Sequence, residues 1–231
     1  MNIRLLQGIE GAKLASGVTV IIDVFRAFTV ECVAFASGVD RIWAVGTIEQ
    51  AFSLAREHPG ALLVGERGGR RCEGFDCGNS PSQLRGHPLS GRSLIHTTSA
   101  GTQGIVNAKG ADALFGASLV NARATAAAVL SLCPEEVSLV CMGLAGLEER
   151  AEDTLCGRYL SSLLRGEEPD IRDEIQALRG TSGKKFFDPA KQEVFPEADF
   201  HMCTALNAYP FALSIRPPAH DGPAQVEKRE V

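Results

Sequence analysis

The sequence lacks the patterns that mark membrane, exported and nucleic-acid-binding proteins. No apolar run reaches the roughly 18 to 20 residues that a bilayer-spanning helix needs. The N-terminus has no basic segment followed by an apolar one and a cleavage site. The net charge is −5 and the basic residues form no long run, whereas a nucleic-acid surface shows a basic stripe. We therefore expect a cytoplasmic protein that binds neither a membrane nor nucleic acid.

Cysteine is present, but not in an arrangement typical of disulfides or zinc. The seven cysteines are scattered, their number is odd, and no Cys-x-x-Cys pair occurs. Most lie in apolar surroundings, as buried thiols in reducing compartments do. Cys72 and Cys77 are the only pair close in sequence, and two thiols without a nearby histidine make a poor zinc site.

Several phosphate-handling and hydrolase motifs are also absent. After Asp23, a haloacid-dehalogenase-type phosphatase would need a second Asp two residues later, where this chain has Phe25. No cysteine is followed six residues later by the arginine of a tyrosine-phosphatase loop. A P-loop has the pattern Gly-x4-Gly-Lys-Ser/Thr. The one Gly-Lys pair of the sequence, Gly183-Lys184, has no glycine at the first position of that pattern and no Ser or Thr after the lysine. The serine motif Gly-x-Ser-x-Gly does not occur.

What the sequence does contain is an alternation of apolar β-rich runs and helical patterns. Its 231 residues and hydrophobic fraction of 45% suit one large domain with a real core. The alternation predicts a three-layer α/β/α fold with a mostly parallel or mixed sheet. The expected strands are 18–23, 41–45, 61–64, 93–97, 113–115, 137–141 and 211–215. The expected helices are 27–37, 49–56, 102–108, 122–132, 151–164 and 198–206.

We expect a single domain over residues 1–216. Residues 167–195 are more charged and lack β patterning, so one or two helices and a loop are expected there. Residues 217–231 are rich in proline and then in charge, which predicts a disordered tail.

Residues 65–69 and 74–81 form a glycine-rich stretch that carries most of the chemistry. Glycine lets backbone N–H groups approach an anion closely. Carboxylates such as Glu66 and Asp76 would repel that anion unless a divalent cation bridges them. The stretch therefore predicts a phosphate-and-metal site.

Other polar groups follow the ends of predicted strands. In parallel α/β sheets, ligands bind beyond the carboxyl ends of the strands. Asp23 and Arg26, Glu66 and Arg67, residues 97–102, and Glu152-Asp153 all follow such ends. Each has a plainer alternative: helix capping for Asp23 and residues 97–102, favourable dipole placement for the two acids, and solvation for Arg67. Together they predict one site at one edge of the sheet.

The chain resembles the 2-phosphosulfolactate phosphatases, the ComB family. The matching blocks occur in family order and are residues 22–27, 65–69, 74–81, 97–102, 118–122 and 152–157, with a weaker match over 199–211. The resemblance implies a magnesium-dependent phosphatase that acts on phosphosulfolactate in coenzyme M biosynthesis, with an α/β fold peculiar to the family. Ala100 stands where the family usually has Asn, which leaves the exact substrate open.

The strand ends and the resemblance together lead us to expect the following roles. The expected catalytic residues are Asp23, Arg26, Glu66, Arg67 and Asp153. The expected substrate-binding residues are Gly68, Gly69, Asn79, Thr97, Thr98, Gly101, Thr102 and Asn121. We expect Mg²⁺ to be held by oxygen ligands from among Asp23, Glu66, Asp76, Glu152 and Asp153.

The nucleophile and the wider function stay open. A metal-bound water with a carboxylate base is the first choice, attack by Asp23 the second and attack by Cys77 the third. Arg70, Arg71 and Lys109 are spare cations that could meet the carboxylate and sulfonate of the substrate, but a solvated role is the favoured alternative for each. The rival functions are a non-catalytic binder of a phosphorylated or sulfonated metabolite and a metal-dependent enzyme acting on another small phospho-acid. A homodimer is expected only because small α/β enzymes often form one.

Overall fold

The computed structural model describes residues 1–217 and 222–231, and a ten-stranded sheet runs through its centre. The strand order is β1-β8-β2-β7-β9-β10-β3-β6-β4-β5. The strands are β1 (Asn2–Gln7), β2 (Gly17–Ile22), β3 (Arg41–Ala44), β4 (Leu62–Arg67), β5 (Arg70–Arg71), β6 (Ser93–Thr97), β7 (Ala111–Ala117), β8 (Glu136–Cys141), β9 (Phe211–Arg216) and β10 (Ala224–Glu230).

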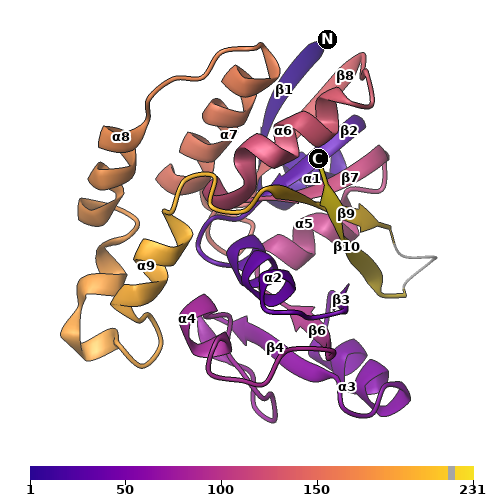
Figure 1. Ribbon diagram of the computed structural model, residues 1–231, viewed down its shortest axis with the longest axis vertical. Coiled ribbons are helices and arrows are strands. Elements are labelled where there is room, and N and C mark those ends of the chain that lie inside the picture. Colours follow the sequence, from indigo (N-terminus) through magenta and orange to yellow (C-terminus); the bar gives the residue numbers. More distant parts are fainter. Residues whose placement is uncertain (218–221) are drawn as a thin grey trace.

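Helices cover both faces of this sheet (Figure 1). They are α1 (Gly8–Lys13), α2 (Ala27–Ala36), α3 (Ile48–Glu57), α4 (Pro81–Leu84), α5 (Gly101–Asn107), α6 (Ala122–Leu130), α7 (Ala151–Leu164), α8 (Arg172–Ala177) and α9 (Glu197–Cys203), with short 3₁₀ helices η1 (Leu119–Asn121), η2 (Leu178–Gly180), η3 (Lys184–Phe187) and η4 (Pro189–Lys191). Among the described residues, no helix combines the length and apolarity that a membrane crossing needs.

Strand β2 shows why the layers form. Its apolar run is buried on both faces, as in a strand of a covered parallel sheet. Val20 and Ile22 pack in the cluster formed with α6 and α7, whereas Ile21 packs in the cluster formed with α2 and α5. Phe28 of α2 belongs to that second cluster and is fully buried. The structure thus confirms the predicted mixed α/β fold with a helix layer on each side of the sheet.

The sheet consists of two parallel groups of strands joined by a hairpin. Strands β1, β8, β2 and β7 are parallel, as are β3, β6 and β4. Between the groups, the β7–β9, β9–β10 and β10–β3 pairs are all antiparallel. Three antiparallel steps give the two groups opposite senses along the sheet. In a flat sheet their carboxyl ends would lie at opposite edges.

Twist of the sheet overcomes this separation. The backbone N–H of Gly101, after β6, donates to Asp23 Oδ2, after β2, at 2.9 Å. Adjacent strands rotate by roughly 20–25° each, and two-stranded ribbons rotate more, so the rotation accumulates across the hairpin. Figure 1 shows β4 lying crosswise to β1 and β2. The carboxyl ends of both groups therefore meet.

The prediction of a disordered C-terminal tail is wrong for residues 224–230. These residues form β10, which pairs with β9 on one side and β3 on the other. Ala224 and Val226 are buried, whereas Gln225 between them and residues 227–230 after them are less so. Pairing on both sides supplies backbone hydrogen bonds, so two small apolar side chains suffice to hold a strand whose charge suggested disorder. Residues 218–221 of the expected tail lie outside the described residues.

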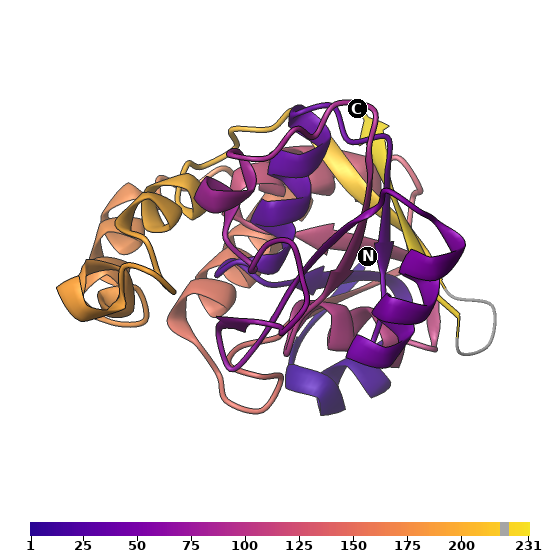
Figure 2. The same ribbon diagram turned by 90° about the horizontal axis from the view of Figure 1, so that it is seen from below.

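The charged segment between α7 and β9 forms a lobe at one side of the molecule. Both views place α8 and α9 there, beside the edge of the sheet (Figures 1 and 2). Helix α9 packs against α4, which follows the glycine-rich stretch. The lobe thereby brings residues from the end of the chain to the strand ends described next.

Candidate active site

The carboxyl ends of β2, β4, β6 and β8 enclose a small cavity of about 130 Å³. We call it the Asp23 pocket, and its polar lining includes Asp23, Arg26, Glu66, Asn79 and Lys185. Gly68, Gly69 and Ser99 complete its wall from the glycine turn and from the loop after β6. The structure therefore brings together groups that the sequence places at separate strand ends.

Asp23 is buried and held by backbone donors. Its Oδ1 accepts a hydrogen bond from the Ala27 N–H at 3.3 Å, and its Oδ2 accepts one from the Gly101 N–H at 2.9 Å. Burial, reinforced by the charges of Glu66 and Glu152, outweighs these bonds and raises the pKa of Asp23 to about 6. A Cβ at Gly101 would lie 2.7 Å from Ala27 Cβ, so only glycine permits this approach. Asp23 is thus an acid whose protonation can change near neutral pH.

Asp153 ties three elements together beneath the pocket. Its Oδ1 accepts from the Val24 N–H at 2.8 Å and its Oδ2 accepts from the Gly143 N–H at 2.7 Å. Burial, then the charges of Glu152 and Asp23, raise the pKa of Asp153. Because both carboxylate oxygens bond to backbone and the side chain does not line the pocket, Asp153 fixes the loops after β2 and β8.

Glu152 differs from its neighbour. Its side chain is buried at the start of α7, and its Oε2 has no hydrogen-bond partner among the described residues. Its charge acts on Asp23, Asp153 and Lys185. An unpaired buried carboxylate oxygen is costly unless a cation satisfies it.

Glu66 organises the glycine turn. Its Oε2 accepts from the Gly69 N–H at 2.6 Å, and its Oε1 accepts from the Ser99 N–H at 2.7 Å. Gly68 and Gly69 have φ values of 60° and 82°, which favour glycine. A Cβ at Gly69 would also lie 2.5 Å from the ring of Phe195. The turn therefore depends on these glycines and on the Glu66 carboxylate.

Arg26 is a buried cation fixed at the mouth of the pocket. Its Nη1 donates to Asp199 Oδ2 at 2.7 Å and to the Val194 carbonyl at 2.9 Å. Its Nη2 lies 3.5 Å from the Gly69 carbonyl, and its guanidinium carbon lies 5.0 Å from the ring centre of Phe195. Arg26 lines the pocket, but most of its hydrogen bonds are already made within the protein.

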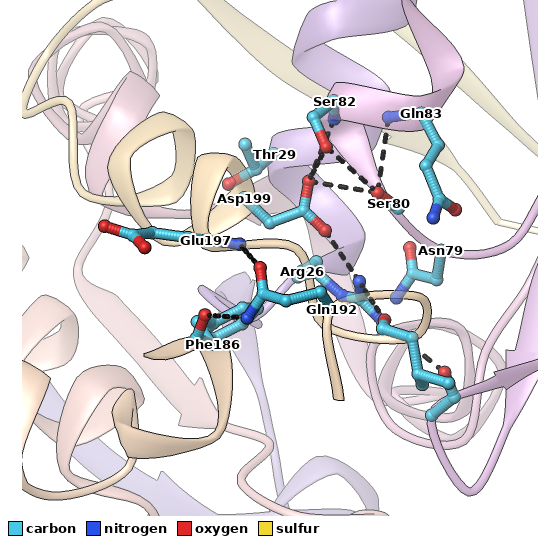
Figure 3. A network of polar contacts seen from close by, with 12 residues as sticks. Arg26, Thr29, Asn79, Ser80, Ser82, Gln83, Phe186, Gln192, Glu197 and Asp199 are labelled. Atoms are coloured by element: carbon cyan, nitrogen blue, oxygen red, sulfur yellow. Dashed lines mark hydrogen bonds and ion pairs between the residues drawn. The ribbon is translucent and has the colours of Figure 1, made fainter. Parts of the chain in front are cut away.

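Asp199 is the centre of a network that the sequence analysis missed (Figure 3). It is fully buried, and its Oδ1 accepts from Ser80 Oγ at 3.0 Å, from the Ser82 N–H at 2.9 Å and from Ser82 Oγ at 2.6 Å. Together with the Arg26–Asp199 ion pair, these bonds join α9, α4 and the segment after β2 that contains Arg26. The only sequence signal was the weak resemblance over 199–211.

Lys185 is a second residue that the sequence did not indicate, and unlike Asp199 it is a cation. It lines the Asp23 pocket from η3, and its Nζ lies 5.0 Å from the ring centre of Phe195 and 5.4 Å from that of Phe186. Burial lowers the pKa of Lys185 against the attraction of Glu152 and Asp23. It makes no hydrogen bond or ion pair with any residue that the structure describes. Nothing in the sequence around 167–195 indicated that this lysine faces the site.

Asn79 lines the pocket and is the last of three buried side chains that are hydrogen-bonded in a row. His96 Nε2 lies 3.2 Å from Asn79 Oδ1, and His96 Nδ1 lies 2.9 Å from Glu31 Oε1. His96 and Glu31 are both fully buried. With Oδ1 occupied by His96, the amide nitrogen of Asn79 remains to donate to a ligand.

Arg67 does not line the Asp23 pocket. Because side chains alternate along β4, it points away from Glu66. Its guanidinium donates to Thr97 Oγ1 at 2.9 Å, to the Gly46 carbonyl at 3.1 Å and to the Glu66 carbonyl at 2.7 Å. It lines a separate cavity with Gly46 and Gln103. Arg67 and Arg26 therefore line different cavities, although the sequence led us to expect both beside one phosphate.

Asp76 also lies away from the other acids. Its side chain accepts from the Leu63 N–H at 2.8 Å and so fastens the glycine-rich stretch to β4. In the described part of the chain, no group of three or more His, Cys, Asp and Glu side chains forms a ready metal site. Of the five acids among which Mg²⁺ ligands were expected, Asp23 and Glu66 line the pocket, and Glu152 is close enough for its charge to act on Asp23.

The remaining predicted binding residues have structural bonds. Thr98 and Thr102 cap the start of α5 reciprocally, at 2.8 and 3.1 Å. Asn121 Oδ1 accepts from the Ser118 N–H at 2.9 Å in a capping box. Thr97 accepts from Arg67, as described above. None of the four lines the Asp23 pocket.

Cys77 is not suited to act as the nucleophile. Burial raises the pKa of Cys77 to about 11, although Arg71 opposes the shift. The thiolate, not the thiol, is the nucleophilic form, so Cys77 is unreactive near neutral pH.

Comparison with known proteins agrees with the resemblance. The family model described as 2-phosphosulpholactate phosphatase matches residues 4–211. A protein of Bacillus subtilis (strain 168) named "Probable 2-phosphosulfolactate phosphatase" is 31% identical over 220 residues, 94% of each chain. Proteins of the same name from Symbiobacterium thermophilum and Caldicellulosiruptor saccharolyticus are 37% and 34% identical, covering 72% and 75% of this chain and 71% and 73% of their own. The chain therefore belongs to the 2-phosphosulfolactate phosphatase family of phosphoric monoester hydrolases.

Proposed function

We propose that the protein hydrolyses the phosphate monoester of 2-phosphosulfolactate, with one Mg²⁺ ion, to give sulfolactate and inorganic phosphate. The observation that carries the proposal is the Asp23 pocket itself. A buried carboxylate with a pKa of about 6 shares a small cavity with the cations Arg26 and Lys185. A non-catalytic anion binder gains nothing from Asp23 and Glu66 in that wall, because both repel the ligand.

The acids of the site fit a magnesium ion. Mg²⁺ takes oxygen ligands and commonly binds one or two carboxylates, several waters and substrate phosphate. Glu66 lines the pocket. Glu152 lies outside that lining, but its charge acts on Asp23 and it has a buried oxygen without a partner among the described residues. We assign these two residues to hold the ion. When bound, it neutralises phosphoryl oxygens and orients the attacking water.

The chain's own residues then have separate tasks. Asp23 accepts the proton of the attacking water, because a general base works best when its pKa lies near the operating pH. Lys185 and the amide nitrogen of Asn79 donate to phosphoryl oxygens, since both have unused donors. Arg26, held by Asp199, shapes the mouth and contributes its positive charge. Direct attack by Asp23, which forms an acyl phosphate, is the alternative.

The test is release of inorganic phosphate from 2-phosphosulfolactate by the purified protein. We expect turnover with millimolar Mg²⁺ and its loss in excess EDTA, restored by adding Mg²⁺ back. Turnover that persists in EDTA contradicts the magnesium role. No release from 2-phosphosulfolactate, but release from another small phospho-acid, contradicts the substrate. A phosphoenzyme trapped at Asp23 contradicts the role of Asp23 as a base.

Two further proposals concern where the protein acts and how it assembles. We propose that the protein acts in the cytoplasm in coenzyme M biosynthesis or a related sulfonate route, and that it forms a homodimer, as small α/β enzymes often do. Sedimentation of the purified protein at two concentrations tests the dimer.

A further inference from the structure

A larger cavity adjoins the Asp23 pocket. It has a volume of about 570 Å³ and shares Arg26, Gly69 and Asn79 with the Asp23 pocket. Its other lining includes Arg70, Arg71 and His87. We call it the arginine pocket.

The two arginines of this pocket have little to bind within the protein. Strand β5 folds back on β4, with Arg71 opposite Glu66 and Arg70 opposite Arg67. Arg71 Nη1 makes one long bond, 3.4 Å, to the Asp76 carbonyl. The side chain of Arg70 makes no hydrogen bond or ion pair with any described residue. Both guanidinium groups therefore keep most of their donors for a ligand.

Two carboxylates also line the arginine pocket, and they do not cancel these donors. Asp76 directs Oδ2 to the Leu63 N–H at 2.8 Å, and Glu193 is exposed to solvent. Neither forms an ion pair with Arg70 or Arg71 in the described part of the chain. Both arginines line the arginine pocket even though alternation places Arg71 on the Glu66 face of the hairpin and Arg70 on the Arg67 face, so an anion in that pocket lies beside both.

The Asp23 pocket is much smaller than the cavity beside it. Its volume is about 130 Å³, against about 570 Å³ for the arginine pocket. Substrate atoms beyond the ester oxygen can extend from it into an adjoining cavity. The arginine pocket shares three lining residues with the Asp23 pocket, whereas the cavity beside Arg67 shares only Ser99. The Arg67 guanidinium also already donates to three acceptors.

We infer that the arginine pocket binds the acidic tail of the substrate, through Arg70 and Arg71, while the phosphoryl group lies in the Asp23 pocket. The inference rests on the proposed phosphatase function and names the part of that site that selects the substrate. The ligand class is a small phosphate monoester with a carboxylate or sulfonate two to three bonds from the ester oxygen. Guanidinium groups suit such planar or trigonal oxyanions because they donate in pairs.

The test compares three monoesters that differ only in the tail. They are 2-phosphosulfolactate, 2-phospholactate, which lacks the sulfonate, and ethyl phosphate, which lacks both acids. Hydrogen bonds to charged groups are worth roughly 1.5–3 kcal/mol. We therefore expect Arg70→Ala/Arg71→Ala to lower kcat/KM for 2-phosphosulfolactate by at least about tenfold, and that for ethyl phosphate by less than about threefold. The matched control is Arg56→Ala, which removes an exposed arginine in the last turn of α3 that lines neither pocket.

Two outcomes overturn the inference. One is an equal loss for all three monoesters, since a tail subsite must act selectively. The other is a selective loss in Arg67→Ala but not in the double variant, which places the tail in the other cavity.

A binding measurement separates this inference from the proposed function. Calorimetry with sulfolactate, which has the tail but no phosphate, needs no turnover. Binding to the wild type that weakens at least about tenfold in the double variant supports the subsite, even if no monoester is hydrolysed. Equal affinity of both proteins for sulfolactate, or no binding to either, overturns it.

Discussion

The Asp23 pocket and the arginine pocket share a wall but are built in opposite ways. In the first, the carboxylates of Asp23 and Glu66 are buried and accept backbone N–H groups at 2.6 to 3.3 Å. In the second, Arg70 and Arg71 are exposed and largely unbonded. A reacting centre needs groups fixed before the substrate arrives, because reorganisation at the moment of reaction is costly. A subsite that selects a tail can rely on flexible side chains that order on binding.

The largest expected effect is on the fixed pocket. Asp23→Asn keeps the shape of the side chain but cannot accept a proton, so we expect kcat to fall by roughly 10²- to 10⁴-fold. Phosphate release under saturating Mg²⁺ measures the effect, and circular dichroism checks the fold. Asp76→Asn is the matched control, and it should change kcat far less because Asp76 lies outside this pocket. Near-native turnover of Asp23→Asn removes Asp23 from the mechanism.

The wall between the pockets depends on the buried Arg26–Asp199 ion pair. Removing one partner of such a pair costs about 3–5 kcal/mol, because the other charge is left uncompensated. We therefore expect Asp199→Ala to lower the free energy of unfolding by that amount in urea titrations. Ser82→Ala removes one donor to Asp199 and should cost only about 1 kcal/mol. Similar losses in the two variants contradict a central role for the ion pair.

The raised pKa of Asp23 also predicts how stability depends on pH. The folded protein binds a proton at Asp23 up to about pH 6, whereas the unfolded chain releases it near 3.8. Stability therefore falls as pH rises between these values, by about 3 kcal/mol in total. Urea unfolding of the wild type and Asp23→Asn at pH 4, 5, 6 and 7 measures this difference. If the difference between the two proteins stays constant with pH, the pKa of Asp23 is not raised.

A smaller effect on kcat/KM is expected from the hydrogen-bonded side chains Glu31, His96 and Asn79, which orient the Asn79 amide. Asn79→Ala should lower kcat/KM by about tenfold, the typical worth of one donor to a charged oxygen. His96→Gln should lower it less, and adding it to Asn79→Ala should cause little further loss, since His96 acts through Asn79. A double-mutant cycle measures this coupling. Additive losses indicate that His96 has only a packing role.

Local pattern was enough for many elements of the fold. The expected strand 93–97 and helix 151–164 coincide with β6 and α7, and Gly38 ends α2 at a φ of 89°. Strand β10 was missed because five of its seven residues are polar, and only pairing with β3 and β9 makes it a strand.

The polar strand ends do lie together, but for a reason that the structure revises. From the sequence we expected strand ends to share an edge because the strands are parallel. In fact the strands before Asp23 and before Glu66 belong to groups of opposite sense, and the twist across β9 and β10 brings them together. Sequence alone could not show this, because the twist arises from strand pairing over long separations.

The sequence by itself determined the family, the helix and strand layers, and the identity of Asp23, Glu66 and Arg26 as pocket residues, because short motifs and strand ends are local. Tertiary structure decided that Arg67 and Asp76 lie outside the pocket, since that depends on side-chain alternation and on backbone partners. It alone brought Lys185 and Asp199 to the site, from positions more than a hundred residues along the chain from Asp23 and Glu66. Contacts of that kind form only when separate elements pack, and no local pattern encodes them.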